Sequence, residues 1–144
     1  MALTSAYDSS ILKLILTAAG ITNIADNTAT SPATVVWIGL HEADPGTAGD
    51  QTTNETAYTG YARVSVARST AGWVVGAAGN ASPAAAITFG TATTTSTGTI
   101  TYGSIGLSSS GAGTLIASGA ISPSINYGQN VIPQLTTGSS FTLV

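Results

Sequence analysis

The stretch "ATVVWIGL" (33–40) decides the fold class. β-Branched and aromatic side chains dominate it, and this composition favours a strand that is covered on both faces. The segment "GYARVSVARS" (60–69) then alternates, with Ala62, Val64 and Val66 in one phase. A period of two residues places such side chains on one face of a strand, so both stretches predict β structure.

Working outward, the rest of the chain repeats the same signal between turns rich in Gly, Ser and Thr. Further strands are predicted at 84–90, 98–108, 113–122, 124–135 and 139–144. Within 98–108 the apolar phase changes, which predicts a β-bulge at Gly103. Pro133 predicts an edge position, because proline has no N–H to give to a ladder.

A helical period occurs once, near the N-terminus, at Ile11, Leu14, Ile15 and Ala18. It predicts an amphipathic helix over about 6–19. Ser5 and Asp8 have the spacing of a capping box, and Gly20 suits the residue that follows a helix. The 144 residues therefore predict one domain (1–144) of the all-β class. We expect a β-sandwich or barrel of about seven to eight antiparallel strands with one short N-terminal helix.

Charge is scarce in this chain. Charged residues make up 6% of it, against roughly 25% in a typical soluble domain, and none occurs after Arg68. The net charge is −3 and there are three cationic side chains, which argues against nucleic acid as a partner. Net charge keeps small domains from associating, so a chain with so few charges is expected to function within an assembly.

Cysteine and long apolar runs are both absent from the sequence. We therefore expect no disulfide, no thiolate metal site and no membrane span. The stretch "ILKLILTAAG" lacks a basic region before it, and Lys13 interrupts it, so it does not read as a secretion signal. The sequence predicts a protein made in the cytoplasm.

The segment "HEADPGTAGDQTTNE" (41–55) holds the only histidine and four of the six acids: His41, Glu42, Asp44, Asp50 and Glu55. Calcium binds such oxygens, but the spacing does not match an EF-hand loop. "DPG" is itself a turn signal. We therefore predict a structural turn with no metal or cofactor, and bound calcium is the alternative.

Acid–base catalysis by His41 and two acids is the other possibility in this segment. The sequence has no nucleophile motif to accompany them. We therefore predict that His41 is a packed or hydrogen-bonded residue at the end of a strand, that no residue is catalytic, and that the protein is not an enzyme.

Arg63 and Arg68 are the only cations after the predicted helix. The simplest expectation is an ion pair with Asp44, Asp50 or Glu55 that pins the acidic loop to the sheet. A salt bridge between subunits is the alternative. Exposed pairs stabilise little, so either role requires partial burial.

The two tryptophans are the largest side chains. We expect Trp37, in the middle of a strand, to lie in the core. Trp73 follows a turn, and could cover the core or anchor an interface. An exposed Trp73 in a carbohydrate-binding surface is a further alternative. The candidate interface or loop-anchoring residues are His41, Glu42, Asp44, Asp50, Glu55, Arg63, Arg68 and Trp73.

Several of these motifs together resemble a family of short virion proteins of tailed bacteriophages, often labelled tail fibre or minor structural protein. The similarity is carried by L-H-x-A-D-P-G at Leu40–Gly46, by Asn54–Glu55, by G-Y-A-R at Gly60–Arg63 and by Trp73. It continues through "AAAITF", "GTITYGSIGL" and "GTLIASGAI" to the C-terminal "INYGQNVIPQLTTGSSFTLV". Two features depart from the family pattern: Asn130 stands where an Asp is usual, and a second Trp or His near 102–106 is missing.

The resemblance implies a structural role in the virion and no enzyme activity. A compact domain poor in charge suits a capsid decoration or cement protein that stabilises the shell by mass action. Its expected partners are the major capsid protein and copies of itself, as a dimer or trimer, on the capsid surface. The expected contact element is the 41–59 loop, with the helix as the other candidate. The alternatives are a tail, baseplate or tail-fibre protein and a glycan-binding module on the virion.

Overall fold

A computed structural model describes residues 5–20, 33–77, 79–93, 95 and 97–142. These residues form one helix and nine strands, which confirms a mostly β fold with a short N-terminal helix. The chain divides into two compact units. The first comprises Met1–Val35, Ala67–Ala86 and Leu135–Val144, and the second comprises Val36–Val66 and Ile87–Gln134. The expectation of a single domain stays a prediction.

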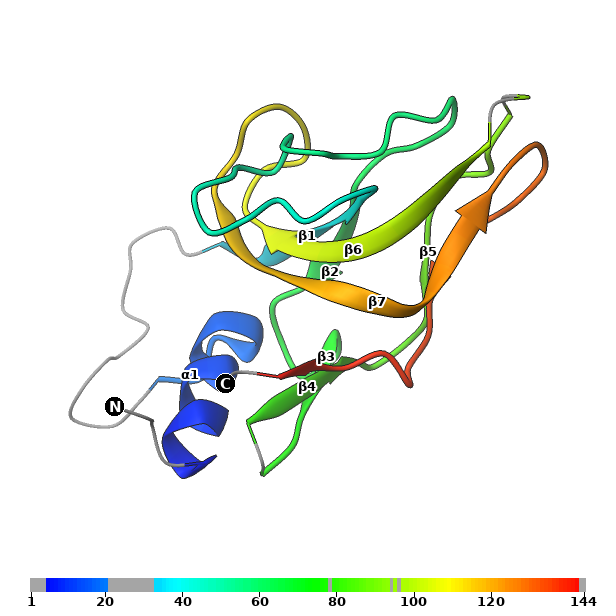
Figure 1. The fold of residues 1–144 in the computed structure, drawn as a ribbon. Helices are drawn as coiled ribbons and strands as arrows, with labels where there is room; N and C mark the ends of the chain where they lie inside the picture. Colours follow the sequence, from blue (N-terminus) through cyan, green and yellow to red (C-terminus); the bar gives the residue numbers. More distant parts are fainter. Residues whose placement is uncertain (1–4, 21–32, 78, 94, 96, 143–144) are drawn as a thin grey trace. The chain divides into compact units, whose positions relative to one another are not determined.

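A four-stranded sheet in the order β2-β1-β6-β7 forms the centre of the second unit (Figure 1). Its strands are β1 (Val35–His41), β2 (Val64–Ala67), β6 (Gly98–Gly106) and β7 (Leu115–Tyr127). β6 pairs antiparallel with β1 on one side and with β7 on the other. β1 and β6 are therefore the two inner strands of this sheet, and β2 and β7 are its edges.

Apolar side chains of β1 supply the core of this unit. Val36, Ile38 and Leu40 are fully buried, as their alternating spacing requires. Trp37 is only partly buried, so the expectation that it belongs to the core is wrong. The reason is its phase, because it points to the face opposite to its two neighbours.

The irregular points of the sheet differ from the predicted ones. Gly103 pairs regularly with Gly119, and the register shifts instead between Ile100 and Tyr102 and between Ile105 and Gly106. β7 also runs on to Tyr127, where the sequence predicted two separate strands. Pro123 does not end the strand, because the register shift between Ile100 and Tyr102 leaves the part of β7 that contains Pro123 outside the regular ladder. The missing N–H of the proline is therefore not needed for pairing there.

An aromatic cluster completes the second unit. Tyr58 contacts both Tyr127 and Tyr61, with ring centroids 5.0 Å and 5.4 Å apart, and Tyr61 stacks on Phe89 at 6.2 Å. The short strands β5 (Ile87–Thr88) and β8 (Gln134–Leu135) pair in a two-stranded sheet of their own. The cluster brings together segments that are far apart in the sequence.

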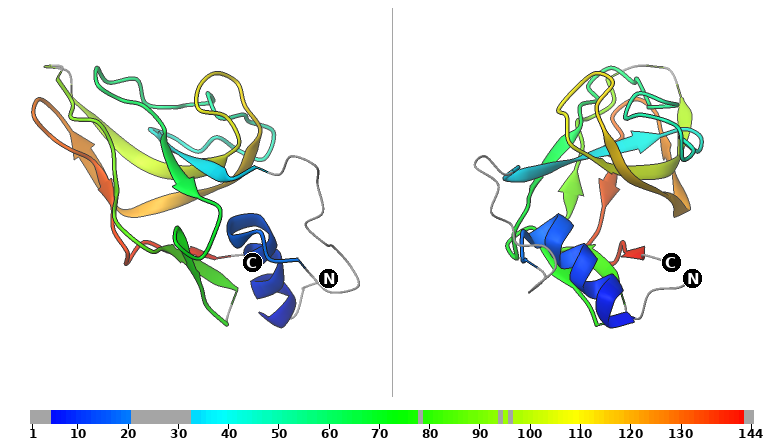
Figure 2. Two further views of the ribbon diagram at one scale, coloured as in Figure 1. Left: turned by 180° about the vertical axis from the view of Figure 1, so that it is seen from behind. Right: turned by 90° about the vertical axis from the view of Figure 1, so that its left-hand side faces the viewer.

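The first unit combines the helix with a three-stranded sheet in the order β3-β4-β9 (Figure 2). Its elements are α1 (Ser5–Thr17), β3 (Trp73–Val75), β4 (Asn80–Pro83) and β9 (Phe141–Thr142). α1 packs on β3 and β4, with Leu12 and Leu16 buried. The sequence did not predict β3 and β4, because strands of three and four residues are too short to show a period.

The helix ends two residues earlier than predicted. Ala18, and not Gly20, adopts the left-handed backbone that ends many helices, with φ of 58°. The Thr17 hydroxyl donates to the Lys13 carbonyl in the last turn, at 2.7 Å. The proposed capping by Ser5 and Asp8 lies outside the described side chains.

Candidate functional site

His41 lies at the end of β1 and is fully buried. Its Nδ1 is 2.8 Å from the Thr53 carbonyl oxygen, which can only accept, so Nδ1 carries the proton and donates. Its Nε2 is 2.7 Å from Ser104 Oγ and therefore accepts from that hydroxyl. The β1–β6 register, which pairs Gly39 with Ser104, places the serine beside the ring.

Desolvation by burial lowers the pKa of His41 below its ordinary value of 6.5, against the opposing effects of the hydrogen bond to the Thr53 carbonyl and of the Glu55 charge. The imidazole is therefore neutral at pH 7. A serine hydroxyl that donates to a histidine has the form of an activated nucleophile. Here both side chains have no solvent exposure, so no substrate can reach Ser104 and the pair serves packing.

Glu55 and Arg63 form a two-point ion pair beside this histidine. Arg63 Nε donates to Glu55 Oε1 and Arg63 Nη2 donates to Oε2, both at 2.6 Å. The guanidinium also donates to the carbonyls of Ser108 and Gly111, at 3.0 Å each. Arg63 is 6% exposed, so its charge is buried and matched by Glu55 rather than screened by water.

Tyr61 extends the same network to the backbone of β1. Its hydroxyl donates to Glu55 Oε1 at 2.8 Å and accepts from the Leu40 N–H at 3.0 Å. Burial is the main cause that raises the pKa of this phenol. Tyr61 therefore stays neutral and joins the ion pair to the strand.

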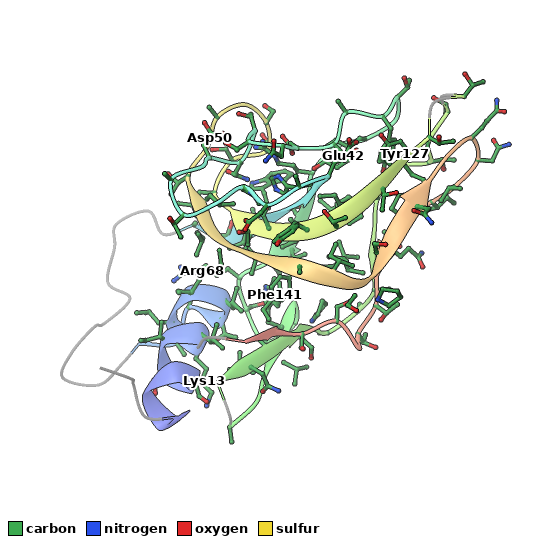
Figure 3. The ribbon with its side chains drawn as sticks, viewed as in Figure 1. Lys13, Glu42, Asp50, Arg68, Tyr127 and Phe141 are labelled. Carbon is green, nitrogen blue, oxygen red and sulfur yellow. The ribbon has the colours of Figure 1, made fainter. Side chains whose placement is uncertain are left out.

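Glu42 contacts a different group of side chains, next to Tyr127 (Figure 3). Its Oε1 accepts from the Tyr127 hydroxyl at 2.7 Å and from Thr56 Oγ1 at 2.9 Å. The carboxylate also raises the pKa of Tyr127. The Glu42 carbonyl accepts from Thr101 Oγ1, so this residue is held through both its side chain and its backbone.

Asp44 and Asp50 organise turns. Asp44 Oδ1 accepts from the Gly46 N–H at 2.9 Å, which is the side-chain turn expected of "DPG". Asp50 Oδ1 accepts from both N–H and hydroxyl of Thr52, and these bonds lower the pKa of Asp50. Within the part of the chain that the structure describes, no three His, Cys, Asp or Glu side chains gather as a metal site would require.

Gln51 is a buried residue that the sequence analysis missed. Its side-chain amide exchanges two hydrogen bonds with the backbone of Ser108, and its N–H donates to the Gly113 carbonyl at 3.1 Å. A Cβ at Gly106 would lie 2.1 Å from the Gln51 side chain, so this glycine is needed for the close approach. The feature of the sequence that could have indicated this contact is the presence of glycines on both sides of the Ser-rich loop.

Arg68 and Trp73 belong to the first unit. Among the described residues Arg68 has no acidic partner, and it donates instead to the Leu14 and Ile15 carbonyls in the last turn of α1 (Figure 3). The negative end of the helix dipole also stabilises a cation at this position. Trp73 is 1% exposed and packs edge-on against Phe141, with centroids 5.7 Å apart, so it is a core residue of this unit.

The structure thus separates the eight candidate residues by role. Three of them, His41, Glu55 and Arg63, lie near one another, since His41 and Glu55 face each other in a β-bridge. His41 bonds Ser104, which the sequence analysis did not single out, and Glu55 bonds Arg63 and Tyr61. The remaining candidates hold other contacts: Glu42, Asp44, Asp50, Arg68 and Trp73. Among these contacts, the bonds of His41 to Thr53 and of Glu55 to Arg63 and Tyr61 hold the acidic segment against the rest of the unit.

The family described as "Podophage GP4 fiber I protein gp80" matches residues 15–140. No curated protein matches the chain. No helix among the described residues is long and apolar enough to cross a membrane.

Proposed function

Because the chain belongs to the family of podophage GP4 fiber I protein gp80, which matches residues 15–140, we propose that it is a structural protein of a tailed-phage fibre. The family itself places the chain among the structural proteins of tailed-phage virions. Its assignment to the fibre is our proposal, and the family match is the observation that carries it.

The polar groups of the second unit support a role without catalysis. A catalytic site needs reacting groups that a substrate can reach. Here the histidine and the serine beside it are not exposed to solvent, and the Glu55 carboxylate, whose side chain is 14% exposed, is bonded by Arg63 and Tyr61. These contacts instead join loops to the sheet, which suits a structural part of a virion.

Self-association is the second part of the proposal. No charged side chain occurs from Ser69 to Val144, a range that includes all of β6 and β7. Surfaces without charge do not repel their own copies. We therefore expect the protein to act as an oligomer, either a dimer or a trimer, within the virion.

A capsid decoration protein bound to the major capsid protein is the main rival. The same low charge and compact β-structure suit it, and the family description favours the fibre over it. A glycan-binding module would need an exposed aromatic platform. Trp73 is buried and the Tyr61 hydroxyl is bonded inside the network, so neither offers such a platform.

Copy number and position in the purified virion test the proposal. A fibre component should be present in a small number of copies per particle by quantitative mass spectrometry, and gold-labelled antibody should mark the tail. A ratio near one to the major capsid protein, with label over the head, would replace the fibre by the decoration protein. Loss of the gene should impair adsorption and leave the heat resistance of the heads unchanged.

A further inference from the structure

The 43–54 segment covers His41 but contributes almost nothing apolar to the core. Its only apolar side chains are those of Ala43, Pro45 and Ala48, and of these Pro45 alone is buried. The core beneath is made by the sheet, with Val36, Ile38 and Leu40 on β1. Regions with few buried apolar contacts open locally at a free energy below that of global unfolding. This segment is therefore attached by hydrogen bonds and can open without the sheet.

Both ends of the segment are fixed. Glu42 is held by the Tyr127 and Thr101 hydroxyls, and Glu55 is held by the ion pair with Arg63. Between these ends, three residues attach the segment to the rest of the unit. The Asn54 carbonyl accepts from the Glu42 N–H at 2.9 Å. Gln51 bonds the backbone of the 108–113 loop, and the Thr53 carbonyl accepts from His41 Nδ1.

His41 is the one group at this contact whose ordinary pKa lies between 5 and 8. Its neutral ring has every polar atom used, with Nδ1 donating to Thr53 and Nε2 accepting from Ser104. A second proton would turn Nε2 into a donor, so the Ser104 hydroxyl would have to reverse its bond and accept, while Nδ1 would keep its bond to Thr53. The added charge would also be sealed from water near the Arg63 guanidinium, whose repulsion opposes the attraction of Glu55.

We infer that the 43–54 segment is an acid-released cover: protonation of His41 opens it, while Glu42, Glu55 and the four-stranded sheet stay in place. Opening gives the imidazolium the water that burial denies it. The charged groups facing His41 are Glu55 and Arg63, and Tyr61 reaches it through Glu55.

The sign follows from proton linkage. In the open form His41 has its ordinary pKa of 6.5, and in the closed form its pKa is lower. The open form therefore binds the proton first, and opening becomes more favourable as the pH falls below 6.5. The opening constant should rise about tenfold for each pH unit until the closed form also protonates.

Amide exchange followed by NMR between pH 8 and pH 5 tests this inference in the full-length protein. After correction for intrinsic rates, the Gln51 amide, which donates to Gly113, should lose protection about tenfold per pH unit below 6.5. The Thr56 amide, which donates to Leu40 outside the cover, should keep its protection. As the chain has one histidine, its ring signals report the His41 titration directly.

Two variants separate His41 from the acids of the segment. His41→Asn keeps a donor for the Thr53 carbonyl but cannot titrate, so the pH dependence of Gln51 protection should disappear. Asp50→Asn, in the cover itself, should leave that dependence intact. If His41→Asn fails to fold, the exchange of the Gln51 and Thr56 amides in the wild-type protein still tests the inference. Constant Gln51 protection while His41 titrates, or equal loss at Gln51 and Thr56, would overturn the inference.

Discussion

Glu55 is the residue on which the second unit's buried network converges. Its two carboxylate oxygens accept from Arg63 Nε, Arg63 Nη2 and the Tyr61 hydroxyl. The side chains of Arg63 and Glu55 are 2% and 14% exposed. A buried pair of this kind is costly to break from one side, because the remaining charge is left without a partner or water.

Replacing Glu55 by glutamine should lower the free energy of unfolding by about 3 kcal/mol, since it leaves the Arg63 charge buried and unmatched. Urea unfolding followed by circular dichroism measures the change. The double variant Glu55→Gln with Arg63→Met is the control. It should be less destabilised than the single variant, because both charges are gone. A single variant as stable as wild type would show that the ion pair does not hold the loop.

At the scale of elements, the fold depends on places where two backbones approach closely. Gly60 has a positive φ of 103°, and a Cβ there would lie 2.1 Å from the Thr91 carbonyl oxygen. A hydrogen bond joins the segments that contain Gly60 and Thr91: the Thr93 N–H donates to the Thr59 carbonyl at 2.9 Å. Only glycine combines this backbone conformation with this contact.

Gly60→Ala should therefore be strongly destabilising, by about 3 kcal/mol or more, as the sum of backbone strain and overpacking. Two matched substitutions separate these effects. Gly111→Ala has a positive φ of 71° and open space, so it should cost about 1 kcal/mol from the backbone alone. Gly119→Ala has neither constraint and should be nearly neutral. Thermal unfolding of the three variants compares them, and equal losses would contradict this account.

At the scale of the whole molecule, the buried phenols make the free energy of unfolding depend on pH in the alkaline range. Desolvation raises the pKa of Tyr58 to about 12, and burial also raises the pKa of Tyr61. In the unfolded chain both phenols ionise near pH 10. Because the unfolded state then loses protons first, the free energy of unfolding is constant at neutral pH and falls above pH 10.

Urea unfolding at pH 8, 9, 10 and 11 should show no change between the first two values and a progressive loss at the last two. Tyr58→Phe removes one of the responsible groups. Its stability should be lower at pH 8, because the hydrogen bond to the Gly90 carbonyl is lost, and should fall less steeply above pH 10. An unchanged slope in that variant would assign the alkaline loss to other groups.

The sequence by itself determined the features that depend on local pattern. Alternation and β-branched composition placed the strand β1, the helical period placed α1, and "DPG" placed a turn at Asp44. Family motifs spread along the chain indicated a virion protein. Each of these signals is complete within a few neighbouring residues, and so it can be seen without the fold.

The tertiary structure alone decided which side chains meet. His41 and Ser104 are 63 residues apart, and Gln51 and Ser108 are 57 apart. Their contacts depend on the β1–β6 register and on the path of the loops, which periodicity does not specify. The same holds for Arg63, which pairs with Glu55, and for Arg68, which binds α1 instead. A buried hydrogen bond is fixed by the pairing of distant segments, so its partners appear only when the chain is folded.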